Sequence, residues 1–147
     1  MEKLLICCLV ILMLFLSIED IQTKEISNFG NLLLLFCSIL YSKLLGNSIG
    51  NILISMSTYI CPLIFLYGYL SDFLKKEILG FGDIKFVMAI GTLMTSYNLW
   101  LSMYYFYMIS FLLASMVGIC LFFRKREKEL AMLPYFSISF CVLKIFL

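Results

Sequence analysis

The sequence predicts an all-α polytopic membrane protein with about six transmembrane helices, because of its high hydropathy, the lengths of its apolar runs and the lack of strand-like alternation. Of its 147 residues, 63% are hydrophobic and 14% are charged, and the mean hydropathy is +1.06. A soluble domain of this length could not hide so many apolar side chains in its core. In lipid, only helices and closed barrels satisfy every backbone polar group, and these runs show no period-two pattern. Helices are therefore the predicted elements.

Six apolar runs, separated by polar or charged residues, define the predicted helices. A spanning helix needs about 20 apolar residues, and these runs lie near or somewhat below that length. No internal repeat or linker divides the chain, so a single integral-membrane domain over residues 1–147 is predicted. The runs are Leu4–Ile18, Phe29–Leu45, Ile49–Leu70, Ile84–Thr95, Leu99–Phe123 and Leu133–Leu147.

The fourth run, Ile84–Thr95, is too short to span alone. At about 1.5 Å per residue its 12 residues cover roughly 18 Å of a hydrocarbon core near 30 Å thick. Either the helix continues into Ser96–Leu99, or its start at Gly80–Asp83 lies below the membrane surface, or the bilayer thins locally. A combination of these would place Asp83 in a partly dehydrated cavity lined by protein.

Basic residues indicate the orientation, because loops rich in lysine and arginine tend to stay in the cytoplasm. The loops after the first, third and fifth runs share one side of the membrane, and the side opposite has few basic residues. We therefore expect a multi-pass protein of the cytoplasmic membrane with both termini outside and with Asp20 and Asp83 at the cytoplasmic face. The first side holds Lys24, Lys75, Lys76, Lys85, Arg124, Lys125, Arg126 and Lys128, and the other holds Lys3, Lys43 and Lys144.

The alternative for the N-terminus is a cleaved signal peptide, since Lys3 precedes a leucine-rich run of suitable length. No small-x-small cleavage site follows this run, and Ser17–Asp20 is a poor substitute. The first run is therefore interpreted as a membrane helix.

Several classes of function are excluded by composition. Histidine is absent, which removes His-based triads and the usual His-containing zinc sites. The six cysteines form no C-x-x-C pair, so neither a metal knuckle nor a redox motif is indicated. A net charge of +2, with the basic residues in short loops, does not suggest a nucleic-acid partner. Carboxylates remain the leading candidates for acid–base chemistry, and no metal or other cofactor is expected.

Two carboxylates, Asp20 and Asp83, are predicted to lie on the same side of the membrane. Asp20 ends the first apolar run, and Asp83 ends Gly80-Phe81-Gly82-Asp83, just before the fourth. Two carboxylates a few ångströms apart in a low-dielectric site cannot both ionise, so they share one proton. One then acts as a base that activates water and the other as an acid that protonates a peptide carbonyl. The pair predicts aspartic protease chemistry.

A plainer interpretation of the same segment is also open. Gly80-Phe81-Gly82 could be a flexible turn and Asp83 the N-cap of the fourth helix, a role that aspartate fills well. The two interpretations are compatible, because a capping aspartate can also be catalytic. In the functional interpretation, Gly80 and Gly82 allow close backbone approach, and Phe81 is an apolar plug or a substrate contact.

These residues resemble the type IV prepilin peptidase family, membrane aspartic proteases with a Gly-x-Gly-Asp motif. That motif is similar to Gly80-Phe81-Gly82-Asp83-Ile84-Lys85, including the lysine two positions after the aspartate. The family's other motif, an aspartate followed by Ile-Pro-Asn, is similar to Asp20 followed by Ile26-Ser27-Asn28, with Ser27 where the family usually has proline. The resemblance spans nearly the whole chain in segment count and motif order.

The resemblance implies that Asp20 and Asp83 are catalytic and that Gly80, Phe81, Gly82, Lys85, Ile26 and Asn28 are binding or structural motif residues. It also implies prepilin or pseudopilin substrates, whose short basic leader is cut at the cytoplasmic face. Many larger relatives carry an N-terminal cytoplasmic domain with cysteine pairs, and this chain resembles a short form without it. Methylation of the new N-terminus, the oligomeric state, the particular pilin-like substrate and the cleaved bond are left open by the sequence.

Two alternatives compete with this assignment. One is a preflagellin-type or intramembrane aspartyl protease that uses the same pair of acids on another substrate. The other is a small non-enzymatic transport or assembly protein in which the acids carry protons or ions. A conduit would need acids at depth, whereas both aspartates are predicted at one membrane edge.

Overall fold

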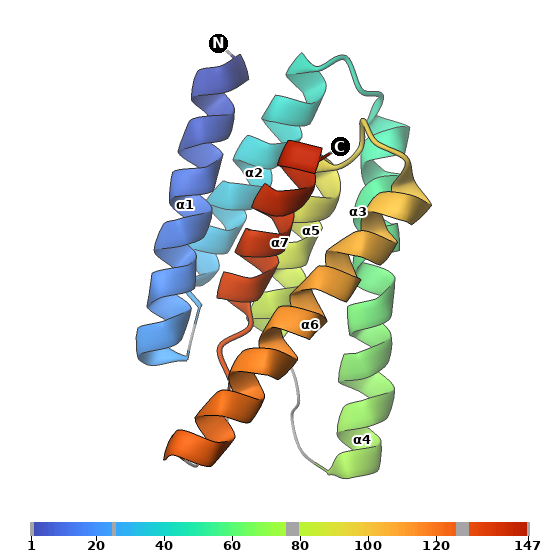
Figure 1. Cartoon of the computed structure of the whole chain (residues 1–147). Helices are drawn as coiled ribbons and strands as arrows, with labels where there is room; N and C mark the ends of the chain where they lie inside the picture. Colours follow the sequence, from blue (N-terminus) through green and yellow to red (C-terminus); the bar gives the residue numbers. More distant parts are fainter. Residues whose placement is uncertain (1, 25, 76–79, 126–129, 147) are drawn as a thin grey trace.

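The computed structural model describes residues 2–24, 26–75, 80–125 and 130–146, and all of its regular elements are helices (Figure 1). A π-helical turn and α4 directly continue α3, so the described residues form six rods, and the all-α prediction is confirmed. The helices are α1 (Glu2–Thr23), α2 (Asn28–Leu44), α3 (Ile49–Phe65), the π-helical turn (Leu66–Leu70), α4 (Ser71–Leu74), α5 (Phe81–Leu93), α6 (Leu99–Lys125) and α7 (Leu133–Phe146).

The helices have the lengths and surfaces of a membrane protein. Three stretches are long and apolar enough to cross a bilayer, Leu4–Thr23, Ile49–Tyr69 and Leu99–Leu121, and α2 and α7 are shorter apolar helices. Large apolar side chains cover the outside of these helices instead of being confined to the interior. A contiguous apolar surface of this kind suits lipid and not water. The chain is therefore a helical membrane protein.

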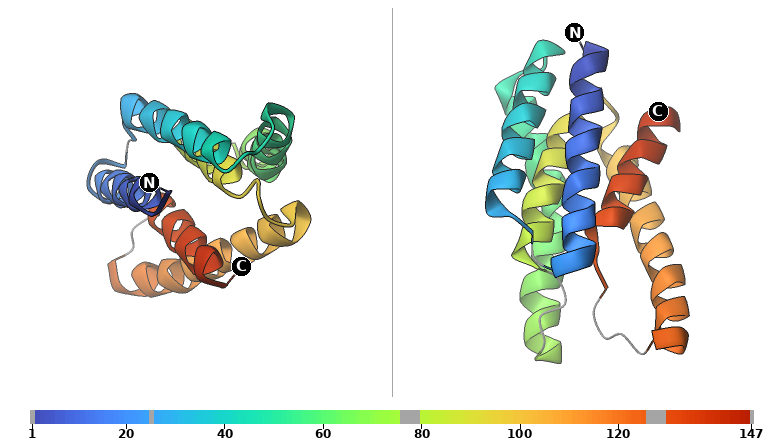
Figure 2. Two further views of the ribbon diagram at one scale, coloured as in Figure 1. Left: turned by 90° about the horizontal axis from the view of Figure 1, so that it is seen from above. Right: turned by 90° about the vertical axis from the view of Figure 1, so that its left-hand side faces the viewer.

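The six rods form two layers of three. In one layer α5 lies between α2 and α3, and in the other α7 lies between α1 and α6. Contacts of α1 with α2, of α5 with α7 and of α3 with α6 join the layers. The view down the bundle shows this arrangement (Figure 2). The short helix α5 is thus enclosed by its neighbours, and nine of its residues are buried.

Close backbone approach packs α5 against α3. A Cβ atom added at Gly91 would lie 3.0 Å from the Cβ of Tyr59 and 3.1 Å from the backbone of Ser55 and Met56. The Ser55 hydroxyl donates a hydrogen bond of 2.6 Å to the Gly91 carbonyl oxygen. Small residues and hydroxyl groups at helix contacts are the usual means of helix association in lipid.

Hydroxyl pairs and aromatic rings join the helices of the other layer. Ser17 of α1 and Ser137 of α7 are 2.7 Å apart at their hydroxyl oxygens, and Ser110 of α6 donates to Ser139 of α7 over 2.8 Å. The rings of Phe106 and Phe136 stack with centroids 5.7 Å apart. These contacts fix α7 between α1 and α6.

Both termini lie at one end of the bundle, and the ends of α1, α4 and α6 point to the other (Figure 1). Successive rods therefore run in alternating directions, as the predicted topology requires. The predicted basic loops fall partly on residues 76–79 and 126–129, which lie outside the described residues.

Several helix boundaries differ from the sequence prediction, and those of α1 and α5 lie next to the two aspartates. Helix α1 continues past Ile18 to Thr23 and ends where Lys24 takes a positive φ of 55°. Helix α5 begins at Phe81 and ends at Leu93, so it does not continue into Ser96–Leu99. Helix α5 is short, but its neighbours in the bundle enclose it, so its apolar side chains contact protein.

Candidate active site

Asp20 lies in the last turns of α1 and is held by the start of α7. Its side chain is only 6% exposed, and its Oδ2 accepts a hydrogen bond of 3.1 Å from the backbone N–H of Leu133, the first residue of α7. The first N–H groups of a helix have no partner within the helix, and the partial positive charge there favours an anion. The side chain of α1 thus caps a helix more than a hundred residues later in the chain.

Asp83 is the third residue of α5, and the N-cap position belongs to Gly80. The predicted alternative, in which Asp83 is the N-cap, is therefore wrong by three residues. Asp83 Oδ2 accepts a hydrogen bond of 3.0 Å from the Gly80 N–H, which is the reciprocal half of a capping box. The side chain is 6% exposed, and its Oδ1 is buried with no hydrogen-bond partner among the described residues. This oxygen is the one available to a proton or a substrate.

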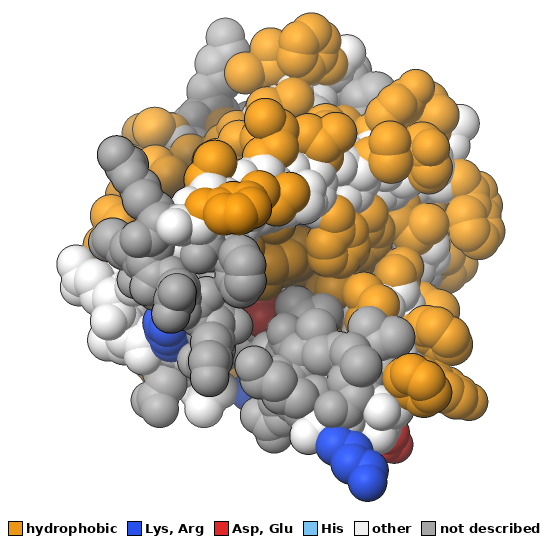
Figure 3. Space-filling view, turned by 60° about the horizontal axis from the view of Figure 1, so that its bottom comes forward, with side chains coloured by type: hydrophobic (Ala, Val, Ile, Leu, Met, Phe, Trp, Pro, Cys, Tyr) orange, Lys and Arg blue, Asp and Glu red, His pale blue; other side chains and the backbone are white. Residues whose placement is uncertain are grey.

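The two carboxylates come from different layers and both lie at the end of the bundle opposite the termini. Asp83 precedes the apolar run that starts at Ile84 and lies outside the candidate membrane spans. Burial, and to a smaller extent the negative charge of Asp20, raise the pKa of Asp83 to about 7, and the Gly80 N–H partly opposes this. The negative charge of Asp20 therefore acts on the carboxyl group of Asp83. Acidic side-chain atoms are visible in a hollow when this end is viewed (Figure 3).

Gly82 and Ile26, two of the motif residues, pack against each other. A Cβ atom added at Gly82 would lie 2.7 Å from Cδ1 and 3.2 Å from Cβ of Ile26. Close approach at this glycine therefore holds the segment after α1 against the start of α5. Gly80 has an ordinary φ of −76°, and an added Cβ there would meet nothing nearer than 3.5 Å. Only the second glycine of the motif is required by packing.

Lys85, Asn28 and Phe81 form a second contact between the two motifs. The Lys85 ammonium donates a hydrogen bond of 2.6 Å to Asn28 Oδ1 and lies 5.1 Å from the centroid of the Phe81 ring. Phe81 is 59% exposed, with one edge near the Tyr67 ring, which makes it more accessible to a substrate than a buried plug would be. Ser27, in place of the usual proline, caps α2 by accepting from the Gly30 N–H at 3.3 Å.

Asn31 was not among the residues singled out from the sequence. It is 1% exposed on α2, its Nδ2 donates a hydrogen bond of 3.2 Å to the Gly82 carbonyl, and its Oδ1 is buried with no partner among the described residues. It therefore holds the peptide that precedes Asp83. A polar residue one turn into an otherwise apolar run was the available signal. The Leu133 N–H is a backbone group, and no sequence motif marks it.

The site can therefore do acid–base chemistry with two buried carboxylates at the end of a membrane bundle. Among the residues the structure describes, no three Cys, Asp or Glu side chains gather as a metal site would require.

The comparison with known families agrees with this geometry. No curated protein and no solved structure matches the chain. The family model described as the type IV leader peptidase family matches residues 7–123, which include both aspartates and all of the motif residues. The chain belongs to the type IV leader peptidase family.

Proposed function

We propose that this chain is a membrane aspartic endopeptidase that cleaves the leader peptide of type IV prepilins or pseudopilins at the cytoplasmic face of the cell membrane, with Asp20 and Asp83 as the catalytic pair. The observation that supports the proposal is a pair of buried carboxylates at one end of the bundle, with the charge of Asp20 raising the pKa of Asp83, in a member of a leader peptidase family. The whole chain acts as one integral-membrane domain.

The reaction follows from one proton shared by the pair. Asp83 carries the proton, and Asp20, which already accepts the Leu133 N–H, acts as the base. Asp20 takes a proton from water while the water oxygen bonds to the scissile carbonyl carbon, and the Asp83 proton passes to the carbonyl oxygen. The tetrahedral intermediate collapses as its C–N bond breaks: Asp20 gives its proton to the leaving nitrogen, and Asp83 takes back the hydroxyl proton as the new carbonyl forms. No cofactor takes part.

The remaining motif residues position this pair. Ile26 and Gly82 bring the end of α1 against the start of α5, and Lys85 ties α5 to Asn28 at the start of α2. The exposed ring of Phe81 lies beside them, where an extended leader would pass. The substrate's apolar helix lies in the lipid beside the bundle and presents its leader junction at this end.

The test is coexpression with a candidate prepilin, followed by gel analysis of the shift from precursor to mature form. Asp20→Asn and Asp83→Asn should each abolish processing while leaving the protein as abundant in the membrane as the wild type. Asp72→Asn is the matched control, because Asp72 is an exposed acid of α4. Normal processing by either amide variant of the pair would end the proposal.

The substrate class is tested separately from the chemistry. Replacing the last glycine of a prepilin leader should strongly reduce cutting if prepilins are the substrate. Undiminished cutting of the altered leader, with both aspartates still required, would favour the preflagellin-type or intramembrane protease.

A further inference from the structure

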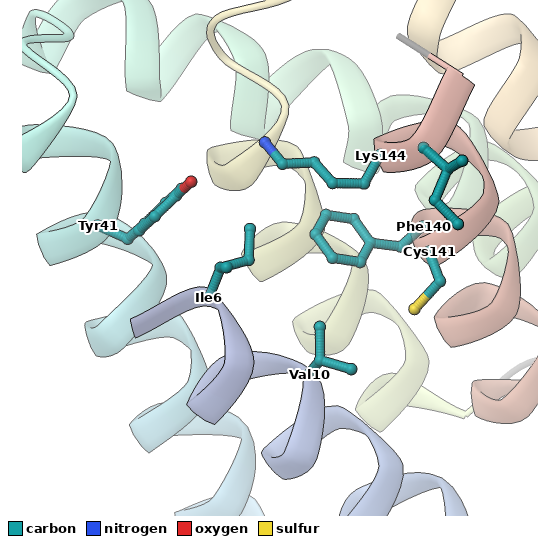
Figure 4. A pocket seen from close by; sticks show the side chains of 7 residues that line it. Ile6, Val10, Tyr41, Phe140, Cys141 and Lys144 are labelled. Atoms are coloured by element: carbon teal, nitrogen blue, oxygen red, sulfur yellow. The ribbon is translucent and has the colours of Figure 1, made fainter. Parts of the chain in front are cut away.

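A second site lies at the end of the bundle that holds the termini, opposite the two aspartates. A cavity of about 390 Å³ opens there between α1, α2 and α7 (Figure 4). Most of its wall is apolar, and two polar side chains stand at it. The wall is formed mainly by Ile6, Val10, Tyr41, Phe140, Cys141 and Lys144.

Two aromatic rings hold the Lys144 ammonium at this cavity. Its Nζ lies 5.8 Å from the ring centroid of Tyr41 and 4.8 Å from that of Tyr97. Cation–π contacts attract the ammonium without neutralising its charge. No acidic side chain pairs with Lys144 within the described ranges. The charge is therefore kept at the mouth of an apolar cavity, although a lysine at a membrane edge could extend freely into water.

The hydroxyl of Tyr41 adds a second donor beside this charge. Tyr41 is 5% exposed, and in the close view its hydroxyl and the Lys144 ammonium point toward the same side of the cavity (Figure 4). Its hydroxyl makes no hydrogen bond to any residue that the structure describes. An ammonium and a phenolic O–H together suit a ligand that supplies anionic oxygen acceptors.

We infer that this cavity binds one anionic phospholipid, with the phosphate at Lys144 and Tyr41 and an acyl chain along Ile6, Val10 and Phe140. Charge complementarity favours an anionic headgroup, because an anion is stabilised beside an unpaired ammonium in a low-dielectric setting. The apolar wall favours a lipid over a free phosphate ion, since the wall can accept the hydrocarbon chain that a free phosphate lacks. The site does not depend on the proposed peptidase activity.

Native mass spectrometry of the purified full chain tests the inference directly. Phosphatidylglycerol and phosphatidylcholine with the same acyl chains are added to the detergent-solubilised protein, and the retained lipid is counted. Wild type should retain phosphatidylglycerol roughly fivefold more than phosphatidylcholine, the contribution expected from one basic residue near an anionic headgroup. Lys144→Gln should abolish this preference, and Lys144→Arg should keep it.

Two further variants separate the site from general surface charge. Lys43 is an exposed basic residue near the same end, in the last turn of α2, and it does not line the cavity, so Lys43→Gln should keep the preference. Val10→Trp fills the apolar part and should reduce retention of both lipids. Equal retention of the two lipids by wild type, or equal losses in the Lys43 and Lys144 variants, would overturn the inference.

Discussion

The two buried carboxylates are held by different partners. Asp20 accepts an N–H from a separate helix, α7, whereas Asp83 accepts an N–H from Gly80 in its own first turn and keeps its Oδ1 unpaired. Acid and base roles are normally divided between paired carboxylates by such differences in environment. The asymmetry assigns the proton to Asp83 in the proposed reaction, and this assignment has a consequence for the pH dependence.

Cleavage should fall as the pH rises above about 7, because the pKa of Asp83 is raised to about 7 by burial and by Asp20. A raised pKa keeps the carboxyl protonated at higher pH than usual, so the proton needed by the carbonyl oxygen is present below this value and lost above it. The value of kcat/KM for leader cleavage should drop about tenfold per pH unit on the alkaline side. The Asp72→Asn control should show the same profile, and a rate that increases from pH 7 to 9 would contradict the assignment.

Lys85 and Asn28 should act as one unit in positioning the site. Removal of their 2.6 Å hydrogen bond by Lys85→Met or by Asn28→Ala should cost about 1 kcal/mol, roughly a fivefold loss in kcat. Because both variants remove the same interaction, the double variant should lose little more than either single one. The measurement is a double-mutant cycle on kcat and KM. A Lys85→Met enzyme with unchanged kcat and KM would show that Lys85 does not orient the site.

The elements of the fold were largely predictable, because each apolar run became a helix. The start of α5 was harder to predict, because its first turn, Phe81–Asp83, contains a charged residue and a glycine. This turn is helical because the Asp83 side chain accepts a hydrogen bond from the Gly80 N–H. The extension of α1 to Thr23 likewise adds a polar turn to an apolar helix. Hydropathy detects the apolar part of a helix, whereas local hydrogen bonds set its ends.

The candidate site was predictable to the extent that it rests on motifs. The partners of the motif residues were not, because Asn31 and the Leu133 N–H approach the site only after α2 and α7 have packed. Contacts over 51 and 113 positions in the chain leave no local pattern. The π-helical turn at Leu66–Leu70 also had no signal in the apolar run that contains it.

Asn31 provides the test of how α2 supports α5. Asn31→Leu keeps a similarly branched side chain but leaves the part-buried Gly82 carbonyl without its donor, a cost of about 1–3 kcal/mol. We expect roughly a tenfold loss in kcat, together with a shift of the alkaline limb of the pH profile, since Asp83 follows Gly82 directly.

Ser38→Ala is the matched control for Asn31. Ser38 is a buried polar residue of the same helix, and its hydroxyl donates only to Leu34 of that helix. This variant should keep both the rate and the pH profile of wild type. A merely structural role of Asn31 would lower the amount of protein in the membrane and leave the pH profile of the remaining enzyme unchanged.

The bundle as a whole brings the two layers together at the aspartate end. α1 and α7 supply Asp20 and the N–H that it accepts, and α5 supplies Asp83, so neither layer contains the complete pair. Destabilising the contact between the layers should therefore affect catalysis before it affects membrane insertion, because each helix can insert on its own apolar character. The pair is a property of the assembled bundle and not of either motif alone.

The orientation of the bundle decides whether this pair can meet a cytoplasmic leader. Eight of the eleven basic residues belong to the aspartate end in the predicted topology, so that end should face the cytoplasm. Alkaline phosphatase fused after Leu147 should be active and green fluorescent protein at the same position dark, and fusions within residues 124–129 should give the reverse. Bright fluorescence at the C-terminus would place Asp20 and Asp83 on the far side of the membrane, and a leader held in the cytoplasm could then not be the substrate even if the pair hydrolyses peptides.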